Sequence, residues 1–74
     1  MARKDPVLVK LGRNLRAARE AKGWSQEQLA FKAGVHRTYV GGVERGEYNI
    51  TVLTLRRFTQ SLGSTVQEAF RGVF

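Results

Sequence analysis

The chain of 74 residues carries 13 lysines and arginines against 6 aspartates and glutamates, so its formal net charge is +7 and its sequence pI is about 10.9. The length allows one domain, the absence of cysteine excludes disulfides and is typical of a cytoplasmic protein, and no apolar run approaches the ~20 residues of a membrane span. A surface this basic attracts phosphate backbones or anionic lipids, and for so small a chain it favours nucleic acid.

The first helix is predicted over residues 6–22. Asp5 can cap its N-terminus, and Pro6 fits the first helical position, where no backbone N–H is needed. Leucines then recur at helical spacing, and Gly23 is a typical C-terminal stop. Gly12 lies inside this helix, where it is expected to permit close packing against another element.

The second and third helices are predicted over residues 26–33 and 37–45. Ser25 and Gln28 form a capping box at the start of the second helix, and Gly34 ends it. Valines at helical spacing mark the third helix, but it contains two adjacent glycines, each of which costs about 1 kcal/mol relative to alanine in a helix interior. A chain this small needs a reason to carry that cost.

Thr51 can cap a fourth helix over residues 52–62, and two overlapping capping boxes can open a fifth over residues 66–73. The sequence has no strand pattern, so the predicted fold class is all-α, with five short helices in one domain that spans residues 1–74. Four apolar side chains of the fourth helix are expected to help form the core: Leu53, Leu55, Phe58 and Leu62.

The second and third helices are joined by only three residues, Gly34-Val35-His36. A connection this short, with a glycine that can adopt positive φ, forces the sharp crossing of a helix-turn-helix at about residues 26–45. Ala30 is small where the two helices approach most closely. Small, glycine and apolar residues at these offsets, on a chain of charge +7, predict a DNA-binding motif.

The stretch from Gln26 to Val43 resembles the helix-turn-helix of the phage Cro and repressor family, also called the xenobiotic-response-element family, through the pattern SQEQLA…AGV…V…VERG. The resemblance extends from about Leu11 to Leu62. The segment AGVHRTYVGGVERGEYN is most similar to the short controller proteins of bacterial restriction–modification systems.

The resemblance implies a lambda-repressor-like fold and a homodimeric transcriptional regulator that binds an inverted repeat in double-stranded DNA, acting in the bacterial cytoplasm at the nucleoid. It implies no cofactor and no metal. A controller protein would regulate its own operon and an endonuclease gene. Activation would need a contact with RNA polymerase, for which Glu27 is the only acidic candidate on the second helix.

Other classes of function are weighed on the same residues. The same fold also serves as a protein-binding adaptor or antitoxin-like module. A peptide that binds a membrane surface through basic residues and Phe70 and Phe74 is a further alternative. An enzyme is disfavoured and no catalytic residue is assigned, because the sequence offers no nucleophile–base pair, no metal-ligand cluster and no phosphate-cradling glycine loop.

On the third helix the valines face the core, and Arg37, Thr38 and Gly41 lie on the outer face, where they are expected to contact DNA bases. Arg37 can pair with guanine, although a phosphate contact or a solvated charge is the alternative. Thr38 can meet thymine or can serve only as a capping hydroxyl. Bare backbone at Gly41, and at Gly42 on the edge of this face, would let the helix approach the bases closely. The alternative for both glycines is that they only relieve a clash against another helix.

A second set of residues is expected to contact DNA phosphates: Gln26, His36, Tyr39, Arg45 and Asn49. The resemblance assigns Gln26 this role, and the N-terminus of the second helix favours an anion there. For Tyr39 the alternative is a ring packed against the second helix. His36 is the only histidine and is isolated, so no metal site is expected. Arg3 and Lys4 could form a flexible basic arm.

Arg19 and Glu44 carry a different expectation. Glu44 lies one helical turn after an inward-facing valine, and Arg19 lies at the edge of the first helix's apolar stripe. The resemblance implies that the two form a partly buried ion pair that orients the third helix, whereas the alternative is two solvated charges.

The last predicted helix carries more apolar surface than the core needs. Phe70, Val73 and Phe74 are therefore expected to extend a self-complementary dimer interface. A two-fold dimer would read two half-sites about 34 Å apart, which one short helix alone cannot do.

Overall fold

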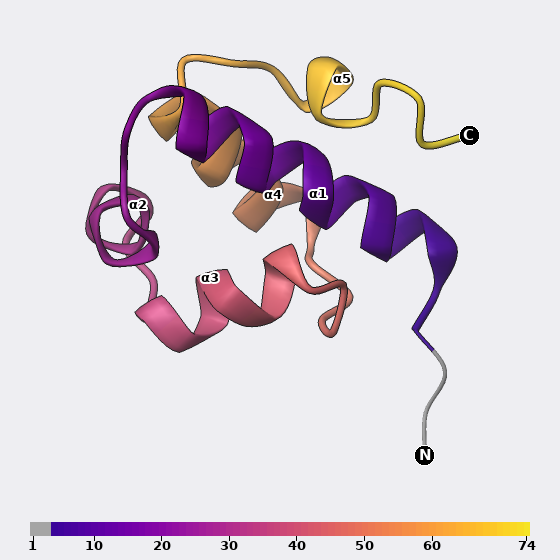
Figure 1. The fold of residues 1–74 in the computed structure, drawn as a ribbon, viewed down its shortest axis with the longest axis horizontal. Helices are drawn as coiled ribbons and strands as arrows, with labels where there is room; N and C mark the ends of the chain where they lie inside the picture. Colours follow the sequence, from indigo (N-terminus) through magenta and orange to yellow (C-terminus); the bar gives the residue numbers. More distant parts are fainter. Residues whose placement is uncertain (1–3) are drawn as a thin grey trace.

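The computed structural model describes residues 4–74, in which every regular element is a helix. The five helices are α1 (Pro6–Ala21), α2 (Gln26–Ala33), α3 (Arg37–Glu44), α4 (Val52–Ser61) and α5 (Val66–Ala69). The long α1 lies across the molecule with α3 below it and α4 behind it. α5 lies above α1, on the side opposite to α3 (Figure 1). The all-α prediction is confirmed, and all five helices begin where the sequence indicates.

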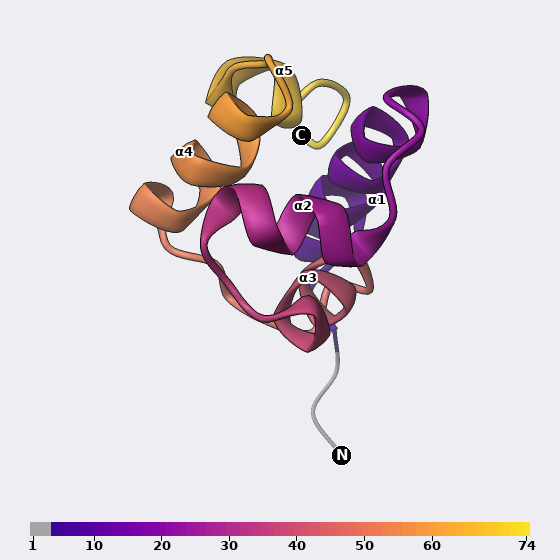
Figure 2. The ribbon, with the colours of Figure 1, turned by 90° about the vertical axis from the view of Figure 1, so that its left-hand side faces the viewer.

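Side-chain caps set the starts of the helices. Asp5 Oδ1 accepts the backbone N–H of Val7 at 2.8 Å. At α2 both bonds of the capping box form, since Ser25 Oγ accepts the N–H of Gln28 at 3.1 Å while Gln28 Oε1 accepts the N–H of Ser25 at 2.7 Å. Gly34 then closes α2 with a left-handed φ of 72°, and this turn directs the chain steeply across into α3 (Figure 2).

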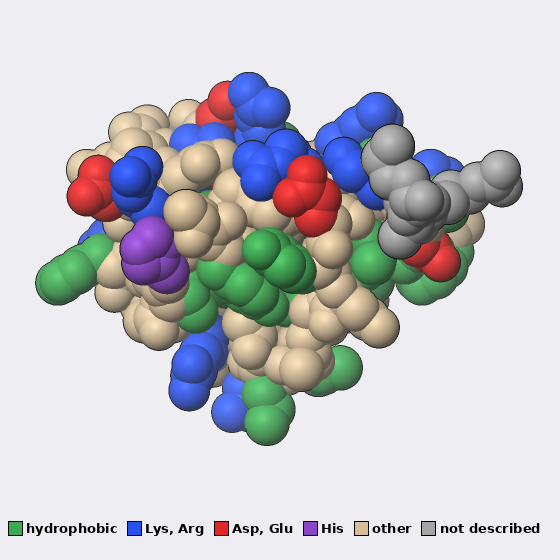
Figure 3. Space-filling model, turned by 90° about the horizontal axis from the view of Figure 1, so that it is seen from below, with side chains coloured by type: hydrophobic (Ala, Val, Ile, Leu, Met, Phe, Trp, Pro, Cys, Tyr) green, Lys and Arg blue, Asp and Glu red, His purple; other side chains and the backbone are tan. Residues whose placement is uncertain are grey.

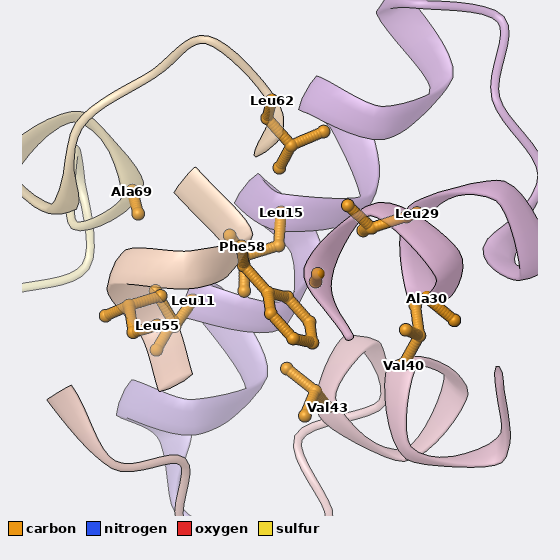
Figure 4. Close-up of a cluster of buried hydrophobic side chains, with 11 residues drawn as sticks. Leu11, Leu15, Leu29, Ala30, Val40, Val43, Leu55, Phe58, Leu62 and Ala69 are labelled. Atoms are coloured by element: carbon orange, nitrogen blue, oxygen red, sulfur yellow. The ribbon is translucent and has the colours of Figure 1, made fainter. Parts of the chain in front are cut away.

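The core lies where α1, α2, α3 and α4 meet (Figure 4). The ring of Phe58, fully buried, lies at its centre among the side chains of Leu15, Leu29, Val40 and Leu55. The buried apolar side chains are Leu11, Leu15, Leu29, Ala30, Ala33, Val40, Val43, Leu55, Phe58, Leu62, Ala69 and Val73. These residues come from all five helices and the segment after α5, so α3 is held by the same core as the rest of the chain.

Two expectations for the C-terminal half are wrong. The fifth helix ends at Ala69 rather than at Val73. The side-chain amide of Asn14, on α1, donates to the backbone oxygens of Ala69 and Arg71 at 2.7 and 2.8 Å, which ties these carbonyls to α1 instead of to a longer helix. Leu53 is exposed. It lies on the side of α4 opposite to the inward face that the core leucines and phenylalanine share.

α1 and α3 come into direct backbone contact at Gly12. A Cβ at this position would lie 2.5 Å from the carbonyl oxygen of Val43 and 2.6 Å from that of Glu44. Neither atom can move without displacing the end of α3. The close approach expected at Gly12 is therefore present, and it fixes the distance between α1 and the C-terminal end of α3.

We predict that Gly12→Ala destabilises the fold by about 1–3 kcal/mol, because the new methyl group overlaps backbone atoms of α3. Arg13→Ala, at an exposed site on the same helix, is the matched control and should change the free energy of unfolding by less than about 0.5 kcal/mol. Urea denaturation followed by circular dichroism measures both. A Gly12→Ala variant more stable than the parent, as expected for alanine in an uncrowded helix, would contradict the account.

Candidate nucleic-acid interface

A cleft opens between the N-terminus of α2 and the outer side of α3. Its lining residues are Arg19, Ser25, Gln26, Glu27, Arg37, Thr38, Gly41 and Arg45. Five of the eight residues that the sequence predicts to contact DNA therefore lie together. His36 lies in an adjoining hollow with Arg37, while Tyr39 and Asn49 are outside the cleft. Seen from the side on which α3 lies, this face of the molecule carries basic side chains, with acidic ones among them, around hydrophobic side chains that reach the surface in its middle (Figure 3).

The first turn of α3 carries exposed Arg37 and Thr38, and His36 is its N-cap. His36 Nδ1 accepts the backbone N–H of Thr38 at 3.1 Å and lies 2.7 Å from the Thr38 hydroxyl oxygen. An Nδ1 that accepts a backbone N–H leaves the ring proton on Nε2. His36, which the sequence predicts to contact a DNA phosphate, also caps the helix that carries Arg37.

The carboxylate of Glu44 links α3 to α1 and α2. Arg19 Nε donates to Glu44 Oε2 at 2.7 Å and Arg19 Nη2 donates to Oε1 at 3.1 Å, with only 10% and 2% of the two side chains exposed. Arg19 Nη1 also donates to the backbone oxygen of Trp24 at 2.6 Å. The hydrogen bonds that Arg19 donates to Glu44 raise the pKa of Arg19 above its usual range. The ion pair is present, so the alternative of two solvated charges is excluded.

Gln26 completes this network from the first position of α2. Its Nε2 donates to Glu44 Oε1 at 3.0 Å. Its Oε1 lies over α3, 3.2 Å from where a Cβ of Gly41 would be. The side chain expected to contact a phosphate is therefore also a bridge between the two helices of the motif. One amide proton of Gln26 and the backbone N–H groups of Gln26 and Glu27, which precede the capped N–H of Gln28, remain for an anion.

Gly41 is buried, so the expectation of bare backbone at this position is wrong. The side chains of Gln26 and Arg45 cover it, and a Cβ there would lie 3.2 and 3.1 Å from their terminal atoms. Gly42 is buried as well, for a different reason. A Cβ at Gly42 would overlap the ring of Tyr48 and lie 2.6 Å from its Cδ2. The open choice for Gly42 is resolved in favour of the relief of a clash, against a loop residue rather than another helix.

Tyr39 is part of an aromatic cluster with Tyr48 and Phe58. Its ring stacks on that of Tyr48 with centroids 5.1 Å apart and planes at 19°, and it meets the edge of Phe58 at 6.2 Å and 82°. Burial and the neighbouring Tyr48 raise the pKa of Tyr39 above its usual range, so its phenol stays neutral. Tyr48 is an exposed aromatic residue beside α3 for which the sequence predicts no role. In the sequence, only the two glycines of α3 indicate that a bulky side chain packs against this helix.

The side chain of Arg45 already has an acidic partner. Its Nε and Nη2 donate to the two carboxylate oxygens of Glu47 at 2.9 and 3.1 Å, which lowers the pKa of Glu47. Lys4 Nζ lies 3.9 Å from the same carboxylate. Both sides of this cluster are exposed, so the ion pairs are weak and can be exchanged for other anions. Arg3, the other residue of the expected basic arm, lies outside the described residues.

At the C-terminal end the residues expected at a dimer interface differ in exposure. Val73 is buried within the subunit and cannot contribute exposed surface, so the expectation for Val73 is wrong. The chain turns after α5 and points this side chain inward. Phe70 is half-buried and stacks with Phe74 at a centroid distance of 5.7 Å, and 92% of Phe74 is exposed.

Among residues 4–74, no group of three or more histidine, aspartate or glutamate side chains is arranged to hold a metal ion. No helix in this part of the chain has the length and apolar character needed to cross a membrane.

Comparison with known proteins gives consistent matches. A helix-turn-helix family model matches residues 15–68. The control protein C.SmaI of Serratia marcescens is 46% identical over 56 residues, which cover 76% of this chain and 67% of that protein. The crystal structure of the restriction–modification controller protein C.AhdI from Aeromonas hydrophila has a TM-score of 0.83 at 48% identity, covering 85% of this chain and 96% of that one. The controller protein C.Esp1396I, solved as a tetramer with its natural 35 base-pair operator, has a TM-score of 0.80 at 31% identity. The match covers 90% of this chain and 88% of that one.

We predict that Arg19→Ala costs about 3–5 kcal/mol of folding free energy, because it leaves the buried carboxylate of Glu44 without its cation. Arg16→Ala is the matched control: Arg16 lies on the same helix and pairs with Glu20 at 3.3 Å, but that pair is exposed and should contribute less than about 1 kcal/mol. Chemical denaturation of the two variants measures the difference. Similar losses for both would show that the Arg19–Glu44 pair does not hold α3 in place.

Proposed function

The chain belongs to the Cro/C1-type helix-turn-helix family, and from this premise we propose that it is a sequence-specific transcriptional regulator of the restriction–modification controller type. Its target is double-stranded DNA with two half-sites related as an inverted repeat, and each subunit inserts α3 into a major groove. The protein acts by binding, not by catalysis, in the bacterial cytoplasm at the nucleoid.

The observation that carries this proposal is the cleft between α2 and α3. It combines two exposed guanidinium groups, Arg37 and Arg45, with the hydroxyl of Thr38, the amide of Gln26 and the N-terminus of α2. Such a set suits a phosphate backbone beside a major-groove edge. The net charge of +7 supplies the long-range attraction.

Within the groove, residues at the first turn of α3 contact bases and those around it contact the backbone. Arg37 pairs with a guanine, and Thr38 contacts a neighbouring base through its methyl or hydroxyl group. The phosphate contacts are made by Gln26, His36, Tyr39, Arg45 and Asn49. A phosphate reaching Arg45 replaces the carboxylate of Glu47, an exchange that the exposure of this pair makes easy.

Two subunits are needed for useful selectivity, because one helix of eight residues contacts few bases. We assign the subunit contact to the exposed end of the chain, where Phe70 and Phe74 form a stacked aromatic pair. An exposed phenylalanine at a two-fold axis buries itself against its own symmetry mate. The relative C.Esp1396I binds its operator as a tetramer, so in that protein several subunits share one operator.

The regulated genes follow from the controller type. The proposed targets are the operon of the protein itself and a restriction endonuclease gene. Covering promoter DNA represses transcription. Activation requires a contact with RNA polymerase, for which the exposed Glu27 on α2 is the acidic candidate beside the DNA cleft.

The central test is Arg37→Ala on two kinds of DNA. A preferred operator is first obtained by selecting bound sequences from a random duplex pool. We expect Arg37→Ala to weaken operator binding by about 1–3 kcal/mol while leaving affinity for random duplex nearly intact, measured by fluorescence anisotropy at one fixed salt concentration. Arg56→Ala, exposed on α4, is the control and should change neither affinity appreciably. Equal losses on both DNAs would assign Arg37 to phosphate binding.

The proposed dimer contact predicts a difference between two exposed phenylalanines. Phe74→Ser should weaken self-association at least about tenfold, whereas Phe31→Ser, at a side chain 88% exposed on α2, should leave it unchanged. Sedimentation velocity over a micromolar concentration series gives both dissociation constants. If only Phe31→Ser weakens association, the interface lies on α2, and if the parent chain is monomeric with and without operator, the dimer proposal fails.

A further inference from the structure

The ring of Tyr48 occupies the place on α3 where the side chain of residue 42 would begin. After α3 the chain turns back at Gly46, where φ is +76°, and the following loop lies against the helix. A Cβ at Gly42 would overlap Cε2 of Tyr48 and lie 2.6 Å from Cδ2 and 3.1 Å from Cζ. A loop residue thus supplies the side-chain volume that the helix lacks at this position.

The ring is held in this place from behind. It stacks on Tyr39 at 5.1 Å, and Tyr39 in turn meets Phe58 at 6.2 Å, the residue at the centre of the core. Three aromatic rings therefore connect the loop to the core in one series. Such support fixes the direction of the Tyr48 phenol more firmly than a free surface side chain, which loses rotamer entropy when it binds.

The outward part of Tyr48 remains available. Tyr48 is 45% exposed, and its hydroxyl takes part in no hydrogen bond within residues 4–74. Gly42 lies one helical turn after Thr38 and directly after Gly41, which lines the DNA cleft. The phenol therefore lies beside the surface of α3 that faces the proposed major groove.

We propose that Tyr48 is a specificity-determining residue that contacts DNA in place of a side chain at position 42. This inference rests on the proposed function. The phenol hydroxyl donates to an acceptor on a base edge, and the ring edge contacts the neighbouring base pair. Gly42 is required because any larger residue displaces the ring from this position.

The experiment separates the hydroxyl, the ring and the glycine. Operator and random duplex affinities are measured at one salt concentration for the parent chain and for Tyr48→Phe, Tyr48→Ala, Gly42→Ala and the double variant Gly42→Ala with Tyr48→Ala. Tyr48→Phe keeps the ring and its stack and removes only the hydroxyl. We expect it to weaken operator binding about three- to tenfold, the effect of one hydrogen bond, and random-duplex binding less than about twofold.

The glycine variants test the same contact by a different route. Gly42→Ala should weaken operator binding about as much as Tyr48→Ala, because it displaces the ring. The double variant should bind operator no more weakly than Tyr48→Ala does. It should also unfold at a higher urea concentration than Tyr48→Ala, because alanine then replaces glycine in a helix without a clash. Urea unfolding of each variant at the same time separates a loss of binding from a loss of fold.

Three results would overturn the inference. Unchanged operator affinity for Tyr48→Phe would rule out a contact between the hydroxyl and the DNA. Equal losses on operator and random duplex would make Tyr48 a phosphate contact. Selection from a random pool with Tyr48→Ala that returned the same preferred sequence as the parent would show that Tyr48 adds no specificity. If the parent chain itself prefers no sequence, the proposed function fails together with this inference, a result that differs from all three.

Discussion

One buried carboxylate, that of Glu44, determines where the third helix lies. α3 has eight residues, two of them glycines, so it is too short and too poor in helix formers to persist without tertiary contacts. Glu44 accepts hydrogen bonds from Arg19 on α1 and from Gln26 on α2, and Gly12 brings the backbone of α1 against the same end of α3. The position of Arg37 and Thr38 at the other end of the helix depends on these contacts.

The two sides of α3 are supported in different ways. On the side of α2, polar side chains cover it: Gln26 bridges to Glu44 and Arg45 reaches over Gly41. On the side of the loop, the support is aromatic and runs from Phe58 through Tyr39 to Tyr48. Gly41 thus leaves room for the ends of the Gln26 and Arg45 side chains, and Gly42 leaves room for the ring of Tyr48, so these contacts offset part of the cost of two glycines.

Much of the fold was predictable from local signals. Capping residues and C-terminal glycines act within a few residues, so the helix starts and the helix-turn-helix follow from the sequence. The Arg19–Glu44 pair came from a family resemblance, because the sequence places its partners 25 residues apart without saying that they meet. After α5 the carbonyls of the chain accept from Asn14, 55 residues away, a partner that no local pattern reveals. The burial of Gly41 and Gly42 depends likewise on where the side chains of Gln26 and Tyr48 fold back.

The central claim is that α3 enters the major groove of DNA, and it can be tested without altering the protein. Dimethyl sulfate methylates guanine N7 in the major groove and adenine N3 in the minor groove. On a selected operator, the account predicts that bound protein protects guanine N7 in two segments whose centres are about 10 base pairs apart, while adenine N3 between them stays reactive. Binding that left every guanine N7 reactive, or that protected only adenine N3, would contradict it.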